Sequence, residues 1–464
     1  MQSSNHSRWQ QLLSSTRQGA GQALTRPERT AFQQDYDRIV FSSAFRRLKD
    51  KTQVFPLSKS DYVRTRLTHS LEASCVGRSL GILIGREIIG RHQLTRHEAS
   101  DFGAITAAAC LAHDIGNPPF GHAGEDAIRE WFVSSHLLKK YHLSAAQHAD
   151  FVNYEGNAQG FRTLTRLQGP SNPGLQLTRA VLATFSKYPR ASDLGAENNN
   201  TLEGASAKKF GFFQHDAESF STIASSTGLI ERVSGCAWHR HPLSFLVEVA
   251  DDVCYLIVDL EDAARLGFVS YKEAEQLLAN LASESTSSTR MSRLYDDKER
   301  LEYLRAKAIG HLVDKATEAF LDLEIPILEG TFDDDLLSVT SCHQHLQDIR
   351  ELSNKHIYSA RPALEIETAG FEVLGGLLDL FCNAVEASAG EQRQGTREHM
   401  LLKLIPSQFL LAGNDDAIDS GSNAPQVSTD PYLRMLSIAD FISGMTDSYA
   451  VDLYRKLKGI DLPG

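Results

Sequence analysis

The chain has 464 residues, of which 42% are apolar and 23% are charged, and its formal net charge is −12. This ordinary globular mixture suffices for about two to four domains, or for one large helical domain with additions. The negative overall charge disfavours broad binding to polyanions such as nucleic acids, because such an affinity would need a local basic cluster.

The six cysteines and the N-terminal stretch favour a soluble protein of a reducing compartment. None of the cysteines forms a C-x-x-C pair, so buried free thiols are favoured over a disulfide framework. The stretch MQSSNHSRWQ lacks the apolar centre of a signal peptide, and the apolar runs are shorter than a membrane span. We therefore expect a cytoplasmic protein without a membrane partner.

Apolar residues recur at helical spacing along most of the chain. The clearest stretches are residues 71–89, 103–113, 243–264, 370–385 and 432–456. The sequence shows no sustained alternation of apolar and polar residues, which would be typical of half-buried strands. We therefore predict an all-α fold.

Polar segments interrupt this pattern. Residues 189–209 and 412–431 are rich in Asn, Ser and Gly and follow no periodicity. We predict that both are mobile surface loops. Residues 1–30 are also polar, and we predict that they are partly disordered or make subunit contacts.

The stretch CLAHDIGNPPFGHAGED, residues 110–126, combines chemistry with a sharp change in backbone direction. Small residues predict a helix that delivers His113 and Asp114 at its C-terminal end. Gly116 allows a tight exit, and the Pro-Pro pair prevents continuation of the helix and fixes the path of the loop. A rigid loop directly after a polar pair is typical of a functional site.

Imidazole and carboxylate groups together suit a divalent metal ion, which needs more than two ligands. Two further candidates lie in other predicted helices, namely His69 in RTRLTHSLE and Asp251 in EVADDVCYLIVDLEDA. An aspartate inside an otherwise apolar helix is costly unless it is paired or bound to a cation. The predicted metal ligands, from three helices, are His69, His113, Asp114 and Asp251.

Several arginines precede the first predicted ligand and are candidates for binding phosphate. These are Arg46, Arg47, Arg64 and Arg66, of which Arg66 shares a helical face with His69. A guanidinium group binds phosphate oxygens through its planar fork. We select Arg66 first and Arg47 second; the alternative is a solvated charged face or structural salt bridges.

Other polar residues near these motifs are candidates for supporting roles. Asn117 directly follows the turn after Asp114 and is positioned to meet a phosphate group. Lys208 and Lys209 are further candidates for phosphate contacts. Glu155 and Asn157, in YEGNAQ, are candidates for groups that support the metal ligands.

The His, His-Asp, Asp pattern resembles the metal signature of the HD-domain phosphohydrolases. Within this superfamily the chain is most similar to the deoxyguanosine triphosphate triphosphohydrolase-like proteins. The similar stretches span about residues 30–455 in the right order. They are FSSAFRRLKDKTQV (41–54), RTRLTHSLE (64–72), LAHDIGNPPFGHAGE (111–125), YEGNAQGFR (154–162), EVADDVCYLIVDLEDA (248–263), NKHIYSA (354–360) and ADFISGMTDSYA (439–450).

This resemblance implies an HD-domain helical fold with additional C-terminal helices. The implied parts are a polar N-terminal segment (1–30), a metal-dependent phosphohydrolase core (31–270), and a C-terminal helical region (271–464) that completes the nucleotide pocket and makes subunit contacts. The implied reaction converts a deoxynucleoside triphosphate (dNTP) to the deoxynucleoside and inorganic triphosphate. Manganese, magnesium or iron is the implied cofactor, and the implied assembly is a homo-oligomer, often a hexamer.

The resemblance also implies a catalytic pair, His122 and Glu125. In this pair Glu125 would orient His122 and raise its basicity. His122 would then either take a proton from the attacking water or give one to the 5′-oxygen. The alternative is a surface histidine near a glutamate that favours the start of a helix.

A third implication concerns the deoxyribose. Tyr255 and Asp259 follow Asp251 at one and two helical turns. In the family such residues contact the sugar, with the aspartate accepting from the 3′-hydroxyl and an aromatic ring packed where a 2′-hydroxyl would clash. Tyr358 in NKHIYSA corresponds to another aromatic residue that faces the sugar, and Gln53 in KTQV corresponds to a sugar or base contact. The alternative for both tyrosines is an ordinary core position.

Two other classes of function remain alternatives. The first is another HD phosphohydrolase, acting on a nucleoside monophosphate, a cyclic nucleotide or guanosine tetraphosphate; the segments FRRLKDKTQV and KHIYSA argue against it. The second is a non-catalytic oligomer that senses dNTPs or binds single-stranded nucleic acid. The complete ligand set and the His122–Glu125 pair argue against that reading. No motif indicates which base is preferred.

Overall fold

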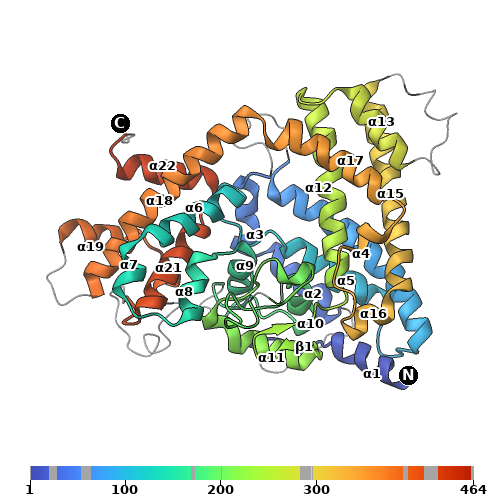
Figure 1. The fold of residues 1–464 in the computed structure, drawn as a ribbon, viewed down its shortest axis with the longest axis horizontal. Helices are drawn as coiled ribbons and strands as arrows, with labels where there is room; N and C mark the ends of the chain where they lie inside the picture. The colour runs from blue at the N-terminus through green and yellow to red at the C-terminus, as the bar shows by residue number, and fades with distance from the viewer. Residues whose placement is uncertain are drawn as a thin grey trace.

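A computed structural model describes residues 2–19, 29–53, 64–168, 173–199, 201–282, 294, 296–389, 395–411 and 427–460. Within this part of the chain, helices joined by loops form nearly all of the structure (Figure 1). Its strands are a short antiparallel pair, β1 (Glu231–Val233) and β2 (Ala237–Trp238). The prediction of an all-α fold is confirmed.

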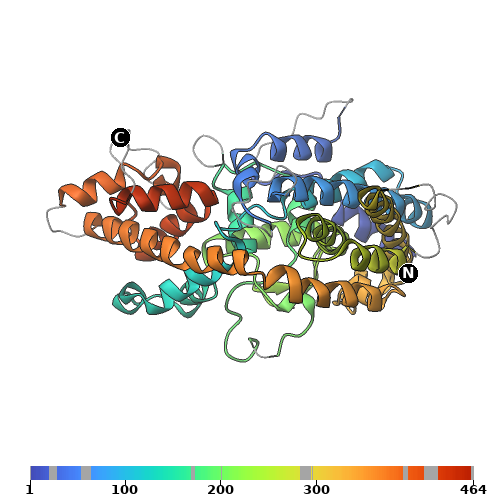
Figure 2. The same ribbon diagram turned by 90° about the horizontal axis from the view of Figure 1, so that it is seen from above.

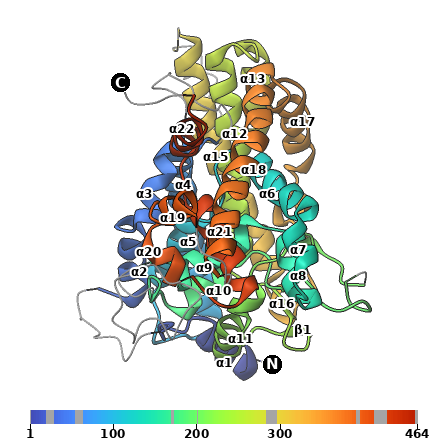
Figure 3. The same cartoon turned by 90° about the vertical axis from the view of Figure 1, so that its left-hand side faces the viewer.

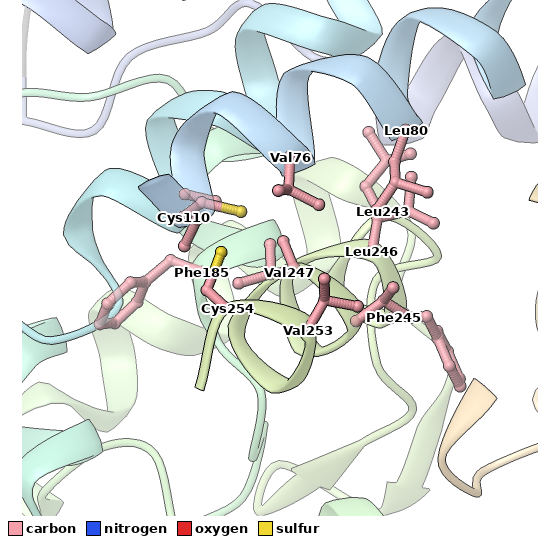
Figure 4. Close-up of a cluster of buried hydrophobic side chains, with 14 of the residues drawn as sticks. Val76, Leu80, Cys110, Phe185, Leu243, Phe245, Leu246, Val247, Val253 and Cys254 are labelled. Carbon is pink, nitrogen blue, oxygen red and sulfur yellow. The ribbon is translucent and has the colours of Figure 1, made fainter. Parts of the chain in front are cut away.

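The first hydrophobic core lies between long helices that carry the predicted metal ligands. Its main helices are α2 (Ala31–Val40), α4 (Arg66–His92), α5 (Ala99–Ala112), α10 (Arg179–Phe185), α12 (Ser244–Leu266) and α15 (Asp297–Asp322). Figure 4 shows apolar side chains of α4, α5, α10 and α12 gathered in this core. Each fully buried Leu or Val contributes roughly 1.5–3 kcal/mol, so this packing fixes how the helices sit.

Small residues let α4 and α5 approach each other closely. A Cβ atom added at Gly77 would lie 2.5 Å from the Cys110 sulfur, and one added at Gly81 would lie 2.7 Å from the backbone oxygen of Phe102. The two helices therefore run antiparallel in close contact. This packing places the start of α4 beside the end of α5, where the two predicted histidine ligands lie.

A second core unites segments that are far apart in the sequence. Helices of the middle of the chain pack here against the C-terminal helices, and Figures 1 and 3 show α6 beside α18. Its helices are α6 (Gly121–Ser134), α7 (His136–Lys140), α8 (Ala145–Val152), α18 (Arg361–Ala389), α19 (Thr396–Leu402), α20 (Ser407–Leu411), α21 (Pro431–Ser443) and α22 (Asp447–Leu457). Seen from above, this group forms one end of an elongated molecule (Figure 2).

Shorter elements connect and cover the two cores. They are α1 (Gln2–Leu12), α3 (Ser43–Arg47), η1 (Leu48–Asp50), α9 (Gly156–Thr165), η2 (Ala205–Ala207), η3 (Gln214–Asp216), α11 (Ala217–Thr227), α13 (Tyr271–Leu281), α16 (Glu324–Glu329), η4 (Leu336–Val339), α17 (His343–Ser353) and η5 (Asn354–Tyr358). The last of these, η5, is a π-helical turn. Such turns are rare and often occur at functional sites.

The structure differs from the sequence expectation at the N-terminus. Residues 2–12 form α1, which packs on the same chain because Trp9 is fully buried and its indole N–H donates to Glu324 at 3.1 Å. Burial of so large an aromatic ring anchors the helix. The expectation of partial disorder is therefore wrong for these residues, whereas the alternative of subunit contacts stays a prediction. Residues 20–28 lie outside the described part.

The periodic stretch 432–456 forms two helices rather than one. Thr446 accepts a hydrogen bond from the backbone N–H of Tyr449 and so starts α22 after the turn at Gly444. Of the predicted loops, residues 189–209 contain only the short η2 within the described part. Most of the segment 412–431 lies outside the described residues.

Helix α18 has the length and hydropathy of a membrane-spanning helix. Half of its most apolar window is buried, and it packs against α6, α19 and α21 in the second core. The core helix of a soluble protein has the same properties, so this helix alone does not indicate a membrane protein.

Candidate active site

The structure brings the four predicted metal ligands together. His69 lies in the first turn of α4, His113 and Asp114 directly follow α5, and Asp251 lies within α12. The Nε2 atoms of His69 and His113 lie 3.1 and 3.4 Å from Oδ1 of Asp251. Ligand atoms of His69, His113 and Asp114 lie within 4.8 Å of one another.

Two details of this cluster fit a divalent metal ion. His113 Nδ1 lies 2.6 Å from the backbone oxygen of Cys110, so Nδ1–H donates there and the Nε2 lone pair faces the cluster. The Oδ2 atom of Asp114 is buried and has no hydrogen-bond partner among the described residues. A buried carboxylate oxygen without a donor needs a cation, and nitrogen and oxygen ligands suit Mn, Fe, Mg or Zn.

The charges within the cluster act strongly on one another. Burial favours a raised pKa for Asp251, but His113 and His69 hold it well below its usual value. Burial favours a lowered pKa for His113, yet Asp114 and Asp251 raise it to about 9. Without a metal ion, both ring nitrogens of His113 therefore carry a proton at neutral pH. A metal ion bound to Nε2 must displace that proton.

Arg66 and Asn117 are both placed against the predicted ligand Asp114. Nη1 of Arg66 and Nδ2 of Asn117 donate to Oδ1 of Asp114 at 2.5 and 2.6 Å. Gly121 makes room for the arginine, because an added Cβ would lie 2.7 Å from its Nη2 atom. Nε of Arg66 is buried and has no partner among the described residues. Arg66 also lines the metal cavity, so the edge of its guanidinium that is not bonded to Asp114 can meet an anion there.

Three cavities meet at His122. The metal cavity, of about 340 Å³, contains three of the predicted ligands together with Arg66 and Asn117. The sugar cavity, of about 160 Å³, is lined by the two predicted tyrosines, and the outer cavity, of about 570 Å³, lies next to Lys209. The metal and sugar cavities share four residues, which are Gln53, Arg66, His122 and Tyr255.

The two tyrosines predicted to read the sugar form a stacked pair. The rings of Tyr255 and Tyr358 have centroids 5.3 Å apart and an interplanar angle of 9°. The hydroxyl of Tyr358 donates to Asp259 at 3.4 Å. Asp259 is buried behind this pair and does not line either described cavity, and burial raises its pKa well above the usual range. Its position suits orienting Tyr358 better than meeting the 3′-hydroxyl directly.

His122 projects from the start of α6 into the space shared by the cavities. Solvent reaches His122, but partial burial by the surrounding walls lowers its pKa. The charge of Glu125 acts in the opposite direction. Glu125 accepts from the backbone N–H of Gly156 at 2.7 Å and lies 3.5 Å from Arg129 and 3.6 Å from Lys209. Within the described residues it makes no hydrogen bond to His122. The structure thus shows no direct contact through which Glu125 would orient His122, and the catalytic role of the pair stays a prediction.

Arg47 does not reach the metal cavity. It lies at the end of α3, where it lines a separate cavity of about 20 Å³ and donates to Ser43 at 3.5 Å. The structure therefore gives no support for the selection of Arg47 as a phosphate ligand, which stays a prediction. Arg64 matches the alternative of a structural salt bridge, because it pairs with Glu72 and Asp262.

Two buried charges that sequence reasoning missed hold the site in place. Lys51 donates to the backbone oxygens of Asn117 and Ser443, at 2.5 and 2.7 Å. Asp447 accepts from the backbone N–H groups of Thr52 and Phe120, at 3.0 and 3.1 Å. Both residues lie in the quoted stretches KDKTQV and GMTDSYA, but their roles depend on contacts between distant segments.

Two residues of the metal cavity carried no sequence signal of their own. Lys187 and Tyr188 line this cavity, and Lys187 lies 3.2 Å from Glu248. No spacing rule identifies these two residues, because they lie in the loop after α10. Of the predicted supporting residues, Asn157 lines the metal cavity, whereas Glu155 and Lys208 line the outer cavity.

The fold and the site together define an HD-type hydrolase. Residues 66–153 match the HD domain family, and this range contains the two histidines and Asp114 of the candidate metal site. The resemblance to HD phosphohydrolases is thereby confirmed.

Comparison with whole proteins narrows the family. The chain is 46% identical over 460 residues to a deoxyguanosinetriphosphate triphosphohydrolase-like protein of Synechocystis sp., covering 98% of this chain and 100% of that protein. It is 38% identical over 470 residues to a protein of the same name from Pseudomonas aeruginosa, covering 98% and 99%. It is 36% identical over 480 residues to one from Listeria monocytogenes, covering 98% and 100%. The chain belongs to the family of deoxyguanosinetriphosphate triphosphohydrolase-like proteins.

Proposed function

We propose that the protein hydrolyses dNTPs to the deoxynucleoside and inorganic triphosphate with the help of a divalent metal ion. The observation that carries this proposal is the position of the candidate metal cluster. It lies between the tyrosine-lined sugar cavity and basic side chains that suit phosphate, with His122 at the junction. The names of the relatives support the same substrate class.

The metal cavity offers positive charge that would stabilise the negative charge of the triphosphate. His69, His113, Asp114 and Asp251 would hold manganese, magnesium or iron. When bound, such an ion supplies positive charge and lowers the pKa of a coordinated water. Arg66, Lys187 and Lys209 line the same cavity and would bind phosphate oxygens by charge-assisted hydrogen bonds. Asn117 would help to position the α-phosphate.

The sugar cavity suits a deoxyribose. The face of the Tyr255–Tyr358 pair offers an apolar surface where a 2′-hydroxyl would have no partner. An unmatched buried hydroxyl costs roughly 1–3 kcal/mol, or about one to two decades in affinity. Asp259 would keep Tyr358 in place through their hydrogen bond.

Acceptor groups at the sugar cavity favour a guanine base. Oε1 of Gln53 is buried without a partner in the described part of the chain. The carboxylate of Glu367 lines the same cavity, which Phe120 and Ile366 make apolar elsewhere. Guanine presents donors at N1 and at its 2-amino group, which two such acceptors would satisfy. Replacement of Glu367 by Gln should therefore reduce the preference for dGTP over dATP about tenfold.

His122 would carry the proton that the reaction transfers. Water adds its oxygen to the α-phosphorus, the bond to the 5′-oxygen breaks, and a proton ends on that oxygen. The walls around His122 lower its pKa, so the free imidazole is neutral at pH 7 and can accept a proton. Once protonated, it can donate to the leaving 5′-oxygen, which would otherwise depart as an unstable alkoxide.

The test is a turnover assay with manganese and a panel of dNTPs and ribonucleotides. Phosphorus NMR in heavy-oxygen water and chromatography would identify the products. We expect deoxynucleoside and intact triphosphate, with kcat/KM for dGTP about ten- to a hundredfold above that for GTP. Primary formation of dNMP and pyrophosphate, or of dNDP and phosphate, would overturn the proposal. Turnover of a nucleoside monophosphate or a cyclic nucleotide instead would favour another HD phosphohydrolase.

A further inference from the structure

The outer cavity continues the metal cavity on the side away from the tyrosine pair. It has a volume of about 570 Å³ and shares His122 and Lys209 with the metal cavity. With the sugar cavity it shares only His122 among the described residues. A volume of this size is typical of a small-molecule site. The metal cavity therefore lies between a space for the sugar and a second, larger space.

The walls of the outer cavity carry positive charge that is not paired with carboxylates. Lys208 is exposed, and its side chain makes no hydrogen bond or ion pair within the described part of the chain. Arg190 donates to the backbone oxygens of Ala191 and Ala207, at 3.1 and 3.0 Å. Such free cationic groups attract anions even though the whole chain has a net charge of −12.

The three acidic groups in the cavity pair with two other cations. Arg129 lies 2.7 Å from Asp126, 2.9 Å from Glu155 and 3.5 Å from Glu125. Lys209 lies 3.2 Å from Glu155 and 3.6 Å from Glu125. The cavity therefore holds four cations against three carboxylates, and Lys208 and Arg190 leave it with net positive charge.

The segment that we predicted to be a mobile loop forms this wall. Residues 189–209 supply Arg190 and Lys208 from their two ends, which the hydrogen bond from Arg190 to Ala207 ties together. Near its C-terminal end, the segment is anchored where Ala205 N–H and the Ser206 hydroxyl donate to Asp333, at 2.8 and 2.6 Å. The two cations are thus held by a fixed backbone path.

Lys209 and Glu155 form the boundary between the two cavities. Glu155 accepts at 3.1 Å from Asn157, which lines the metal cavity, while Glu155 itself faces the outer cavity. Burial, together with the charge of Glu125, raises the pKa of Glu155 to about 7. Part of the population therefore lacks this negative charge at neutral pH, which eases the passage of an anion beside Lys209.

We propose that the outer cavity binds inorganic triphosphate and is the route by which this product leaves the metal cavity. This inference rests on the proposed function. The deoxynucleoside would leave on the opposite side, past the tyrosine pair. Separate exits mean that neither product must wait for the other.

The test measures binding of sodium triphosphate to the full chain by calorimetry, without nucleotide, and then inhibition of turnover by the same compound. We expect Lys208→Gln to weaken triphosphate binding about fivefold, and the charge reversal Lys208→Glu to weaken it further. The KM for dNTP should change less than about twofold, because Arg66 and Lys187 hold the substrate. Lys272→Gln, at an exposed lysine of α13, is the matched control.

Two results would overturn the inference. One is unchanged triphosphate affinity in both Lys208 variants and in Arg190→Gln. The other is a parallel rise of the KM for dNTP and of the dissociation constant for triphosphate, which would show that Lys208 binds the substrate. Calorimetry measures triphosphate binding directly. It therefore tests the outer cavity even if the turnover assay shows other products and the proposed function fails.

Discussion

The unpartnered Oδ2 of Asp114 distinguishes the His69, His113, Asp114 and Asp251 cluster from an ordinary ion pair. In a purely structural cluster each buried carboxylate oxygen would have its own donor. Here Arg66 and Asn117 both donate to the other oxygen, Oδ1. One oxygen is thus oriented by the protein while the second is left for a cation.

We predict that Asp114→Ala removes the metal and abolishes activity while leaving the helical content intact. The loss of this ligand and of the metal ion that it binds should raise the activation barrier by several kcal/mol. The rate should then fall by about three decades. Metal analysis, turnover and circular dichroism would test this. Glu130→Ala, at an exposed acid of α6, is the control. Stoichiometric metal in the Asp114 variant would show that the ligand set is wrong.

His122 permits a second test at the scale of one residue. We predict that His122→Gln lowers kcat by about two to four decades with metal still bound. The pH profile of the wild type then identifies its role: a rate that falls toward acid pH marks a base, and a rate that falls toward alkaline pH marks an acid. The variant should lack that limb, whereas His136→Gln, at an exposed histidine, should keep it. An unchanged rate would show that His122 is only a surface histidine, which was the alternative interpretation.

At the scale of elements, the corner between α21 and α22 organises the loops of the site. Asp447, the first residue of α22, bonds to the backbone of both Thr52 and Phe120. Phe120 has a φ of 64°, a left-handed conformation that costs a non-glycine residue about 1–3 kcal/mol. Its bond to Asp447 helps to hold this conformation, which starts α6 and aims His122.

We predict that Asp447→Asn lowers kcat/KM about ten- to a hundredfold. The amide has one acceptor oxygen where the carboxylate has two, so one backbone N–H loses its partner at a cost of roughly 1–3 kcal/mol. Metal content should not change. Steady-state kinetics with Asp452→Asn, an exposed residue of the same helix, would provide the comparison. Equal loss in both variants would mean that the helix, rather than this contact, matters.

At the scale of the molecule, buried charges join the two hydrophobic cores. Arg162 of α9 bonds to Asp440 of α21 at 2.9 Å and to Asp216 of η3 at 3.3 Å. Removal of one partner from a buried pair leaves the other charge uncompensated, which costs roughly 3–5 kcal/mol. Such contacts fix how α21 sits on α9 and η3, and so they help to place the elements that complete the site.

Lys51 belongs to the same set of contacts, and it should make stability depend on pH. Burial, together with the charge of Arg47, lowers its pKa from 10.5 to about 7. Between these two values the unfolded chain holds more protons than the folded chain, so the free energy of unfolding should rise with pH above about 7. The slope is at most about 1.4 kcal/mol per pH unit.

Urea unfolding of the wild type and of Lys51→Met at pH 6–10 would measure this difference. The wild type should gain stability relative to the variant as the pH rises above 7. Lys49→Met, at an exposed neighbour, should run parallel to the wild type. A constant difference between the wild type and Lys51→Met would show that Lys51 titrates at the same pH in both states.

The sequence alone was sufficient for those features that depend on local spacing. Helical periodicity predicts an all-α fold because each helix buries one face wherever it packs. His69, His113, Asp114 and Asp251 could be identified because a polar ligand at a helix end or in an apolar helix is costly without a partner. Arg66 followed from its place one turn before His69.

Only the tertiary structure decided the features that depend on contacts between distant segments. Lys51 donates to Ser443, which lies 392 residues away in the chain, and no local pattern encodes such a bond. Arg47 resembles Arg66 in sequence, but the end of α3 turns it away from the metal cavity. Asp259 has the correct helical spacing, yet Tyr358 from another element covers it. The outer cavity likewise depends on where the loop 189–209 is anchored, because packing rather than periodicity fixes the path of a loop.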